Sequence, residues 1–332
     1  MPSNPRHRLE KTVFGGTAVS PAVSWTLSVV VAALAVWLLG WMIWGDHYLP
    51  IRWGAFIGPW LGLLAVLCGI AAASIRNWWL AALASVLAFL ILLPVLPRLS
   101  PARWFAADGA SDVRVLTFNV SESNTDYAAM ARVIVAARAD IVFLQQINDL
   151  PALRRQIGDL PGHRNYAAFP ATTMDTAILS RFALLAQHDY PARTTAVAAI
   201  GTCRVRLWDL HAPHGQYGEA DQAAFFRDAA AAIHDEPLTV IAGGDLNSTE
   251  YNAVQAPLRN ELEDAFSRSG SGFGLTFPAP VRRFGIFGRL FAIDHIFFRG
   301  DVTPVFAQVL GDSAKSDHFP VLATFNLKSH CS

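Results

Sequence analysis

Three long apolar stretches without a charged side chain occupy the first third of this 332-residue chain, and they constrain its fold most strongly. They cover residues 23–44, 54–75 and 78–97, and each reaches the about 20 residues that an α-helix needs to cross a bilayer. Tryptophans lie near their expected ends, where an interfacial aromatic belt would place them. The sequence therefore predicts three transmembrane helices over residues 23–97, with the lipid bilayer as a partner.

A cleaved signal peptide is the alternative explanation of the first stretch, because it follows Arg6, Arg8 and Lys11. The stretch is longer than the apolar core of a signal peptide, and two further stretches follow it. The basic residues predict that segment 1–22 is cytoplasmic, and an odd number of spans then puts residues 98–332 on the other side. We therefore expect a multi-pass protein of a bacterial inner membrane whose larger part is periplasmic.

The larger part of the chain has the pattern of a mixed α/β domain. Short runs rich in β-branched and aromatic residues alternate with two helix-like stretches at 126–138 and 219–234. Residues 98–111, with proline, glycine and small polar residues, are expected to be a linker. Residues 112–328 are long enough to form a single domain with one large core.

The charge of this part restricts its partners. Residues 101–332 carry 20 Lys and Arg against 24 Asp and Glu, a net charge of −4. A protein that grips a long polyphosphate backbone normally carries a basic face, so avid nonspecific DNA binding is disfavoured, whereas a small or membrane-held phosphodiester is not. Cys68 lies in a predicted span, and Cys203 and Cys331 are the remaining pair that could form a disulfide.

Five short motifs follow one another in this part, and most place polar residues at or just after the end of an expected strand. They are VRVLTFNV (113–120), ADIVFLQQI (139–147), LHAPHG (210–215), VIAGGDLNSTEY (240–251) and FAIDHIFF (291–298) followed by KSDHFPVLATF (315–325). Together they supply the oxygen ligands and imidazoles that metal-assisted hydrolysis of a phosphate ester requires: Asn119, His211, Asp245, Asn247, Asp294, Asp317 and His318. Each motif means little alone, but their joint order is specific.

Two motifs indicate roles by their spacing. The glycines of GGDLNSTEY allow close backbone approach, and Asp245 and Asn247, two residues apart, point to one face. In SDHFP, Asp317 can face a cation while His318 faces a nucleophilic water. Asp294 is the natural orienting partner of His318, since a carboxylate bonded to one ring nitrogen fixes the tautomer and raises the basicity of the other.

The order of the motifs resembles the endonuclease/exonuclease/phosphatase superfamily, the deoxyribonuclease-I-like fold, over residues 112–327. The resemblance implies an α+β fold, a four-layer αββα sandwich in which two facing mixed sheets are flanked by helices. It also implies that Mg²⁺ or Mn²⁺ is held by three residues, namely Asn119, Gln146 and Asp317.

The resemblance further implies catalytic roles. The histidine at the end of the corresponding strand contacts the scissile phosphate and either protonates the leaving oxygen or stabilises charge on it, a role that falls to His211. His318, oriented by Asp294, would take a proton from the attacking water, with Asp245 as the alternative base. The implied catalytic residues are His211, Asp245, Asn247, Asp294 and His318.

Other polar residues near the motifs are open to two interpretations. Asp175 or Thr176 begins a segment where the family has a supporting side chain, but a capped strand start is equally consistent. His214 is expected to face solvent. His295 should point to the face opposite Asp294 and be structural.

One position departs from the family pattern. Where the family's LQE motif carries a metal-binding glutamate, this chain has Leu144, Gln145 and Gln146. Gln146 keeps an oxygen ligand but removes a negative charge, and Mg²⁺ is held chiefly by carboxylates and phosphate oxygens. Three interpretations remain open: an enzyme with weaker or substrate-assisted metal binding, rescue by Glu122 or Asp149, and a degenerate site that binds without turnover.

We therefore expect a membrane-anchored, divalent-metal-dependent phosphoesterase that hydrolyses a phosphodiester by water attack. Its substrate is either nucleic acid or a phospholipid headgroup, and no protein partner is inferred. The stretch 277–291 has Arg282, Arg283 and Arg289 among several phenylalanines. Three interpretations are open: a loop that contacts a bilayer, a loop that stacks on bases, and a loop at the edge of the hydrophobic core. The alternative function is a degenerate membrane receptor for a phosphorylated ligand.

Overall fold

The computed structural model describes most of the chain. The described residues are 20–100, 103, 111–163, 166–170, 175–190, 192–215, 219–282, 285–286 and 288–328. Most of the predicted cytoplasmic segment 1–22, most of the predicted linker 98–111, and Cys331 lie outside these residues. Every residue of the predicted active site is described.

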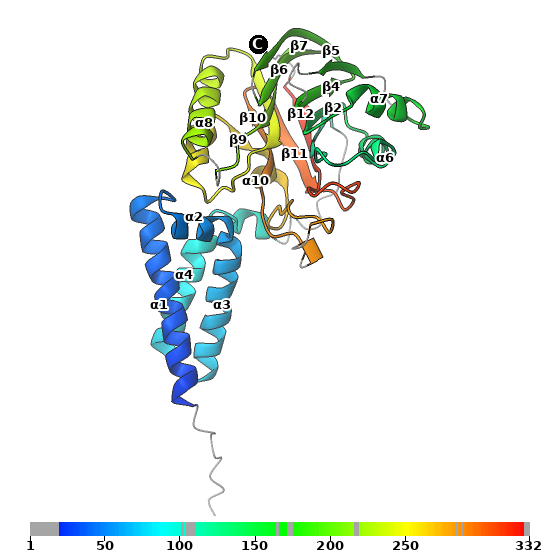
Figure 1. The fold of residues 1–332 in the computed structure, drawn as a ribbon. Coiled ribbons are helices and arrows are strands. Elements are labelled where there is room, and N and C mark those ends of the chain that lie inside the picture. The colour runs from blue at the N-terminus through cyan, green and yellow to red at the C-terminus, as the bar shows by residue number, and fades with distance from the viewer. Residues whose placement is uncertain are drawn as a thin grey trace, which may run out of the picture.

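Four helices near the N-terminus lie against one end of the remaining chain (Figure 1). They are α1 (Pro21–Trp44), α2 (Leu49–Phe56), α3 (Gly58–Ser74) and α4 (Trp78–Leu92). The helices α1, α3 and α4 pack side by side as a bundle, and small buried residues such as Ala65 and Ala84 line their contacts. A Cβ atom on Gly62 would lie 2.5 Å from the side chain of Leu92, so the close helix approach depends on small residues.

The prediction of three transmembrane helices is wrong in number. Within the described residues, α1 alone is a single helix long and apolar enough to cross a membrane. The predicted span 54–75 is broken at Ile57, where α2 and α3 meet with an 80° bend, and the bent pair is a second span at most. The helix within 78–97 ends at Leu92 after 15 residues. At ~1.5 Å per residue it is ~22 Å long, against ~30 Å of hydrocarbon.

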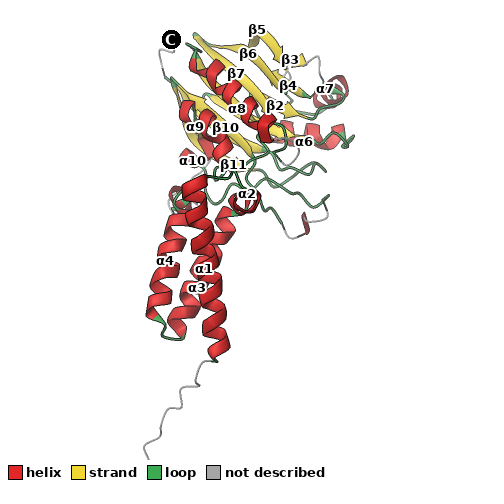
Figure 2. Ribbon diagram, turned by 60° about the vertical axis from the view of Figure 1, so that its left-hand side comes forward, coloured by secondary structure: helices red, strands yellow, loops and turns green. Residues whose placement is uncertain are grey.

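The rest of the described chain forms two mixed sheets that face each other (Figure 2). The strands are β1 (Val113–Asn119), β2 (Ile141–Gln145), β3 (Ala167–Pro170), β4 (Thr176–Ser180), β5 (Ala183–Tyr190), β6 (Arg193–Ile200), β7 (Cys203–His211), β8 (Thr239–Asp245), β9 (Glu263–Asp264), β10 (Asp294–Arg299), β11 (Val302–Val309) and β12 (Val321–Leu327). Their order is β11-β12-β1-β2-β4-β3 in the first six-stranded sheet and β5-β6-β7-β8-β10-β9 in the second. The pairs β1–β2 and β7–β8 are parallel, and the other pairs are antiparallel.

Helices cover the outer face of each sheet, which gives the expected αββα order of layers. The helices α6 (Tyr127–Ala137) and α7 (Leu150–Gly158) pack on the first sheet, and α8 (Glu219–His234) and α9 (Ala256–Glu261) pack on the second. A short helix, α10 (Ala265–Ser269), precedes β10. The inner faces of the two sheets meet in a separate apolar core. The sequence prediction of two facing mixed sheets flanked by helices is confirmed.

Side-chain alternation in the strands determines which polar residues reach the space between the sheets. In β7, Val205 and Leu207 lie in the core between the sheets, whereas Trp208 and Leu210 lie in the cluster under α8. The same alternation directs the later residues of β7 that share a face with Leu207 towards the first sheet. The polar ends of several strands therefore meet at one edge of the sandwich.

Packed contacts join the bundle to the sandwich. A 3₁₀ helix, η1 (Leu96–Leu99), follows α4, and its Arg98 forms an ion pair with Glu250 at 3.1 Å. Both side chains are only 2% exposed. Tyr251 is equally buried and packs against α2 and α4. The predicted linker therefore begins within a packed junction.

Candidate active site

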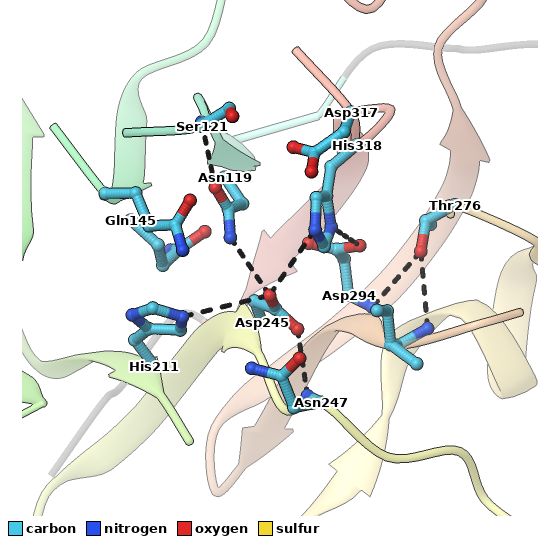
Figure 3. Close-up of polar contacts among 12 residues, drawn as sticks. Asn119, Ser121, Gln145, His211, Asp245, Asn247, Thr276, Asp294, Asp317 and His318 are labelled. Atoms are coloured by element: carbon cyan, nitrogen blue, oxygen red, sulfur yellow. Dashed lines mark hydrogen bonds and ion pairs between the residues drawn. The ribbon is translucent and has the colours of Figure 1, made fainter. Parts of the chain in front are cut away.

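Three polar side-chain pairs connect the two sheets at this edge of the sandwich, and Figure 3 shows two of them, Asn119 with Asp245 and His318 with Asp294. In the central pair, Nδ2 of Asn119, at the end of β1, donates to Oδ2 of Asp245, at the end of β8, at 3.0 Å. The Nε2 atoms of His211 and His318 lie 3.9 and 3.6 Å from the same Oδ2. One buried carboxylate thus lies between two imidazoles.

Two glycines allow the end of β8 to lie close to its neighbours. A Cβ atom on Gly244 would lie 1.7 Å from a carbonyl oxygen of β7, and one on Gly243 would lie 2.7 Å from the ring of Phe143. After the strand, Asn247 adopts a left-handed conformation with φ of +49°, which asparagine tolerates. Its backbone N–H donates to Oδ1 of Asp245 at 2.8 Å, so both carboxylate oxygens are held in place.

His318 is the more buried of the two imidazoles. Its Nδ1 lies 2.9 Å from Oδ2 of Asp294, the first residue of β10. The backbone N–H of Asp294 donates to the hydroxyl of Thr276 at 3.3 Å, and the ring of Phe277 lies 4.8 Å from the imidazole. Burial disfavours the imidazolium, but the carboxylates of Asp294 and Asp245 outweigh it and raise the pKa of His318 to about 9. Without a bound cation, this ring is therefore charged at neutral pH.

The second imidazole, His211, has a carboxylate of its own. Its Nδ1 lies 2.8 Å from Oδ1 of Asp175, the residue before β4. The sequence left a supporting role for Asp175 open, and the structure brings it against His211. Burial opposes protonation, but the hydrogen bond to Asp175 and the charge of Asp245 raise the pKa of His211. His214 is exposed. His295 lies outside the set of residues around Asp245, and its Nδ1 is 2.8 Å from Oδ2 of Asp264.

Asp317 is held by an arginine on one side. Nε and Nη2 of Arg282 lie 2.6 and 2.5 Å from Oδ2 of Asp317. The other oxygen, Oδ1, is buried and has no hydrogen-bond partner among the described residues. An unpaired buried carboxylate oxygen is costly unless a cation or a donor completes its environment.

The carboxylates of the site fit a hard divalent cation. Asp245, Asp294 and His318 each offer a ligand atom within 4.8 Å of the others. Oδ1 of Asp294 and Oδ1 of Asp317 are both buried and without a hydrogen-bond partner among the described residues, so both carboxylates are candidate ligands. Figure 3 shows that Asn119, Asp245 and Asp317 come from separate strands and loops.

Gln146 lies on the loop after β2, with a left-handed φ of +58°. Its Oε1 accepts a hydrogen bond from the backbone N–H of Glu122 at 3.1 Å, so the carboxamide faces the loop that follows Asn119. Asp149 caps α7 by accepting from the N–H of Ala152 at 2.8 Å, and the side chain of Glu122 is exposed. In the described contacts, neither candidate carboxylate takes the place of the missing glutamate.

Sequence reasoning missed a buried carboxylate below the site. Asp209 lies two residues before His211 on the same face of β7 and is fully buried. Its Oδ1 accepts from Nε2 of Gln145 at 2.6 Å, and its Oδ2 accepts from the backbone N–H groups of Leu144 and Ala177, both at 3.1 Å. Burial raises the pKa of Asp209 well above its usual range. This residue connects β7 to β2 and β4 across the sandwich.

The sequence profile of the Endonuclease/Exonuclease/phosphatase family matches residues 116–318, more than half of the chain. This chain belongs to that family. Its members are typically hydrolases that act on phosphoester bonds with divalent metal ions. The matched range contains all eight predicted site residues, from Asn119 to His318.

Solved structures of other proteins share the fold of the sandwich. An endonuclease/exonuclease/phosphatase family protein from Leptotrichia buccalis C-1013-b has a TM-score of 0.54 at 13% identity, and 65% of this chain and 100% of that chain are covered. Bacteroides thetaiotaomicron VPI-5482 mannosyl-6-phosphatase Bt3783 has a TM-score of 0.52 at 18% identity, with 64% and 99% covered. D. rerio TDP2 complexed with single strand DNA product has a TM-score of 0.52 at 19% identity, with 64% and 98% covered. These low identities show the fold alone, and no curated protein sequence gives a significant match.

Proposed function

We propose that this protein is a membrane-anchored, divalent-metal-dependent phosphodiesterase. The observation that carries the proposal is the arrangement around Asp245, which faces two imidazoles that are each bonded to a second carboxylate. The unpaired oxygen of Asp317 belongs to the same buried edge. Such a set supplies a base, an acid and cation ligands together, as hydrolysis of a phosphate ester requires.

The residues proposed to hold Mg²⁺ or Mn²⁺ are Asn119, Gln146 and Asp317, which offer the oxygen ligands that such ions prefer. When bound, the ion would neutralise negative charge on the phosphate. Asp245 and Asn247 lie around the phosphate, and the hydrogen bond between them keeps both side chains in fixed positions.

The proton transfers fall to the two imidazoles. His318, oriented by Asp294, accepts a proton from the water that attacks phosphorus. Because its pKa is raised, the ring must first lose its own proton, which a nearby cation favours; Asp245, 3.6 Å away, is the alternative acceptor. As the bond from phosphorus to the leaving oxygen breaks, His211 donates a proton to that oxygen.

The surface of the bundle supports anchoring in a membrane. Large apolar side chains point outward from it, including Val36, Leu67 and Trp79, which are 71%, 63% and 90% exposed. Soluble proteins rarely expose contiguous apolar surface of this kind. We propose that α1 crosses the bilayer, with α3 and α4 packed beside it.

The position of the sandwich supports an extracytoplasmic active site. The sandwich lies at the C-terminal end of α1 (Figure 1), so a membrane-crossing α1 places it on the side opposite to Pro21, the first residue of that helix. With the basic N-terminal segment in the cytoplasm, this is the periplasmic side of a bacterial inner membrane. Cys203 is disulfide-bonded, as is common in oxidising compartments.

A membrane receptor for a phosphorylated ligand is the second candidate, and Gln146 favours it. A neutral carboxamide in place of a carboxylate lowers the negative charge available to a cation, so the same residues would bind a phosphate without hydrolysing it. Both candidate functions require binding of a phosphorylated ligand, but only the phosphodiesterase hydrolyses it.

The test uses the purified full-length protein in detergent with bis(p-nitrophenyl) phosphate and Mn²⁺. We expect hydrolysis that a chelator abolishes and that His318→Ala lowers ~10²-fold or more, the range for loss of a general base. The matched control is His234→Ala, because His234 on α8 is 71% exposed and pairs with Glu261. Binding of inorganic phosphate without turnover of any diester would favour the receptor.

A further inference from the structure

The segment after the catalytic Asn247 is bound to the helical bundle. The hydroxyl of Tyr251 donates to the carbonyl oxygen of Ile91 at 3.0 Å, and its backbone oxygen accepts from the indole N–H of Trp41 at 2.8 Å. Gly58 faces the tyrosine ring, which would lie 2.7 Å from an added Cβ atom. Tyr251, four residues after Asn247, is therefore packed between α1, α3 and α4 and hydrogen-bonded to α1 and α4.

The neighbours of Tyr251 make further bonds to the same end of the bundle. The hydroxyl of Thr249 donates to the carbonyl oxygen of Ala55 at 3.2 Å, and Nδ2 of Asn252 donates to Oδ2 of Asp46 at 2.8 Å. Thr249, Asn252 and Asp46 are all buried. These buried hydrogen bonds fix the segment after the active site to the end of the bundle.

The opposite wall of the active site also rests on the bundle. The indole N–H of Trp60 donates to the carbonyl oxygen of Leu290 at 2.9 Å, and the ring of Phe56 meets that of Phe291 at 6.0 Å. The ring of Phe291 in turn stacks on that of Phe277, which packs against His318. The edge of the sandwich that holds the active site is therefore the edge that contacts the helices.

The short helix α2 has the position and composition of a helix at a membrane surface. It makes an angle of 80° with α3 and lies across the end of the bundle. Trp44, Tyr48 and Trp53, just before and within it, are 52%, 59% and 51% exposed. Tryptophan and tyrosine concentrate at the interface between hydrocarbon and headgroups, where a helix parallel to the surface can lie.

A loop beside the active site reaches the same level. In Figure 1, the described residues of this orange segment, 279–282, 285–286 and 288–290, extend below the sandwich to the height of α2. It exposes two apolar side chains, Val281 and Ile286, which are 57% and 74% exposed. Between them, Arg282 is exposed and bonds to Asp317 in the active site. The loop thus carries apolar side chains and a cation next to the catalytic carboxylates.

From these contacts we infer that the active site faces the surface of the bilayer that α1 crosses, and that its substrate is a phosphodiester carried by a lipid of that bilayer. This inference rests on the proposed phosphodiesterase function and names the source of the substrate. Trp53, Val281 and Ile286 form a bilayer rim that enters the interface, and Arg282 meets the lipid phosphate at the mouth of the site. The acidic net charge of residues 101–332 disfavours nucleic acid, the competing substrate.

Hydrolysis of such a lipid requires water as its only co-reactant. The oxygen of water forms a bond to phosphorus, and one bond from phosphorus to an ester oxygen breaks. One proton of water goes to the base, and the leaving alcohol receives a proton from His211. The lipid side of the substrate stays in the membrane, so its apolar chains do not have to enter the protein.

The first measurement tests the bilayer rim without using turnover. The full-length Ile286→Cys variant, in a Cys68→Ala background, is labelled with a fluorophore and inserted into vesicles of phosphatidylethanolamine and phosphatidylglycerol. We expect quenching when the lipids are brominated. The control is Leu185→Cys, since Leu185 is 44% exposed on β5, at the end of the sandwich away from the helices (Figure 1). Equal quenching at both positions, or none at Ile286→Cys, would overturn the inference.

The second measurement compares substrates. Full-length protein in dodecyl maltoside micelles receives Mn²⁺ and phosphatidylglycerol, phosphatidylethanolamine or phosphatidylcholine, with bis(p-nitrophenyl) phosphate and single-stranded DNA as alternatives. We expect kcat/KM to be highest for a lipid, and Ile286→Asp to lower it about tenfold, as expected when one large apolar contact with the interface is lost. Leu185→Asp should change nothing, and the soluble diester should be hydrolysed equally by both variants.

The outcomes separate this inference from the proposed function. If the soluble diester or DNA is hydrolysed best and Ile286→Asp does not change hydrolysis of the lipid, the lipid substrate is contradicted but the phosphodiesterase function is retained. If no diester is hydrolysed while Ile286→Cys is quenched by brominated lipid, the proposed function fails and only the position of the site at the membrane remains.

Discussion

The two imidazole–carboxylate pairs of the active site have the same bonding but different access to solvent. The Nδ1–carboxylate distances are 2.9 Å for His318 with Asp294 and 2.8 Å for His211 with Asp175. The side chains of the first pair are 7% and 1% exposed, whereas those of the second are 13% and 30% exposed. Both rings face Asp245.

This difference indicates how the two pairs divide the reaction. The buried pair, His318 with Asp294, keeps its orientation because water cannot take the place of either group. This suits the activation of the attacking nucleophile. A pair that is open to solvent can recover its proton after each turnover, which suits protonation of the leaving group. The two pairs are therefore not equivalent, although their geometry is similar.

The largest expected effect comes from removing the imidazoles. We expect His318→Ala to lower kcat by ~10²–10⁴-fold, the range for general acid–base catalysis, and His211→Ala to lower it less, because water can reach that position. Steady-state kinetics with bis(p-nitrophenyl) phosphate and saturating Mn²⁺ measures both. A larger loss in His211→Ala than in His318→Ala would reverse the assignment of the two pairs.

The orienting carboxylates should show the same order with smaller effects. We expect Asp294→Asn to lower turnover ~10–100-fold, as for other groups that orient an active-site histidine, and Asp175→Asn to fall at the lower end of that range. Each carboxylate acts through the imidazole to which it is hydrogen-bonded, so its removal should both lower kcat and shift the pH dependence of kcat. An Asp294→Asn variant with unchanged pH profile would show that Asp294 is only a packing residue.

The stability of the metal-free protein should depend on pH through His318. Its pKa is about 9 in the folded protein, above the ~6.5 of an unfolded histidine. The stabilising contribution is therefore fully present below pH ~6.5 and is lost as pH rises through 9. Thermal unfolding in chelator from pH 6.5 to 9.5 should show this decline, and His318→Ala should flatten it. Parallel curves for the two proteins would contradict the raised pKa.

The smallest expected effect concerns Gln146. Gln146→Glu adds a carboxylate to the proposed ligand set, so half-saturation of activity by Mg²⁺ should occur at lower metal concentration. The control is Asn148→Asp, which adds the same charge at an exposed neighbouring position. Equal effects of the two variants would show that Gln146 is not a ligand. Tighter metal binding with lower turnover would show that the glutamine is fitted to the substrate.

Much of the sandwich could be predicted because its elements are encoded locally. The expected helices at 126–138 and 219–234 correspond to α6 and α8, and the strand-like runs correspond to strands of the two sheets. The polar motifs lie at strand ends, which meet at an edge of the sheets, so their order in the sequence was enough to collect Asn119, Asp245 and His318 in one site.

The features that were missed either carried a signal that was not used or depend on contacts between distant segments. Gly58 and Pro59 directly follow the 80° bend at Ile57, and Pro94 follows the end of α4 at Leu92, but the apolar composition of the stretches outweighed these helix breakers in the prediction of three spans. The sequence left the role of Asp175 open, and that role becomes apparent only where Asp175 meets His211, 36 residues later. For Asp209 a signal was present, because a charged residue continues the inward-facing series of Val205 and Leu207.

Binding of Mn²⁺ to the full-length protein and to Asp317→Asn, measured by calorimetry, tests the central claim most directly. The carboxylate of Asp317 is buried and one of its oxygens is unpaired among the described residues, which makes it a candidate ligand for a cation. We predict that the wild type binds the ion and that Asp317→Asn loses both this binding and hydrolysis of bis(p-nitrophenyl) phosphate. Wild-type affinity for Mn²⁺ in Asp317→Asn, or turnover that persists in it without bound metal, would contradict the account.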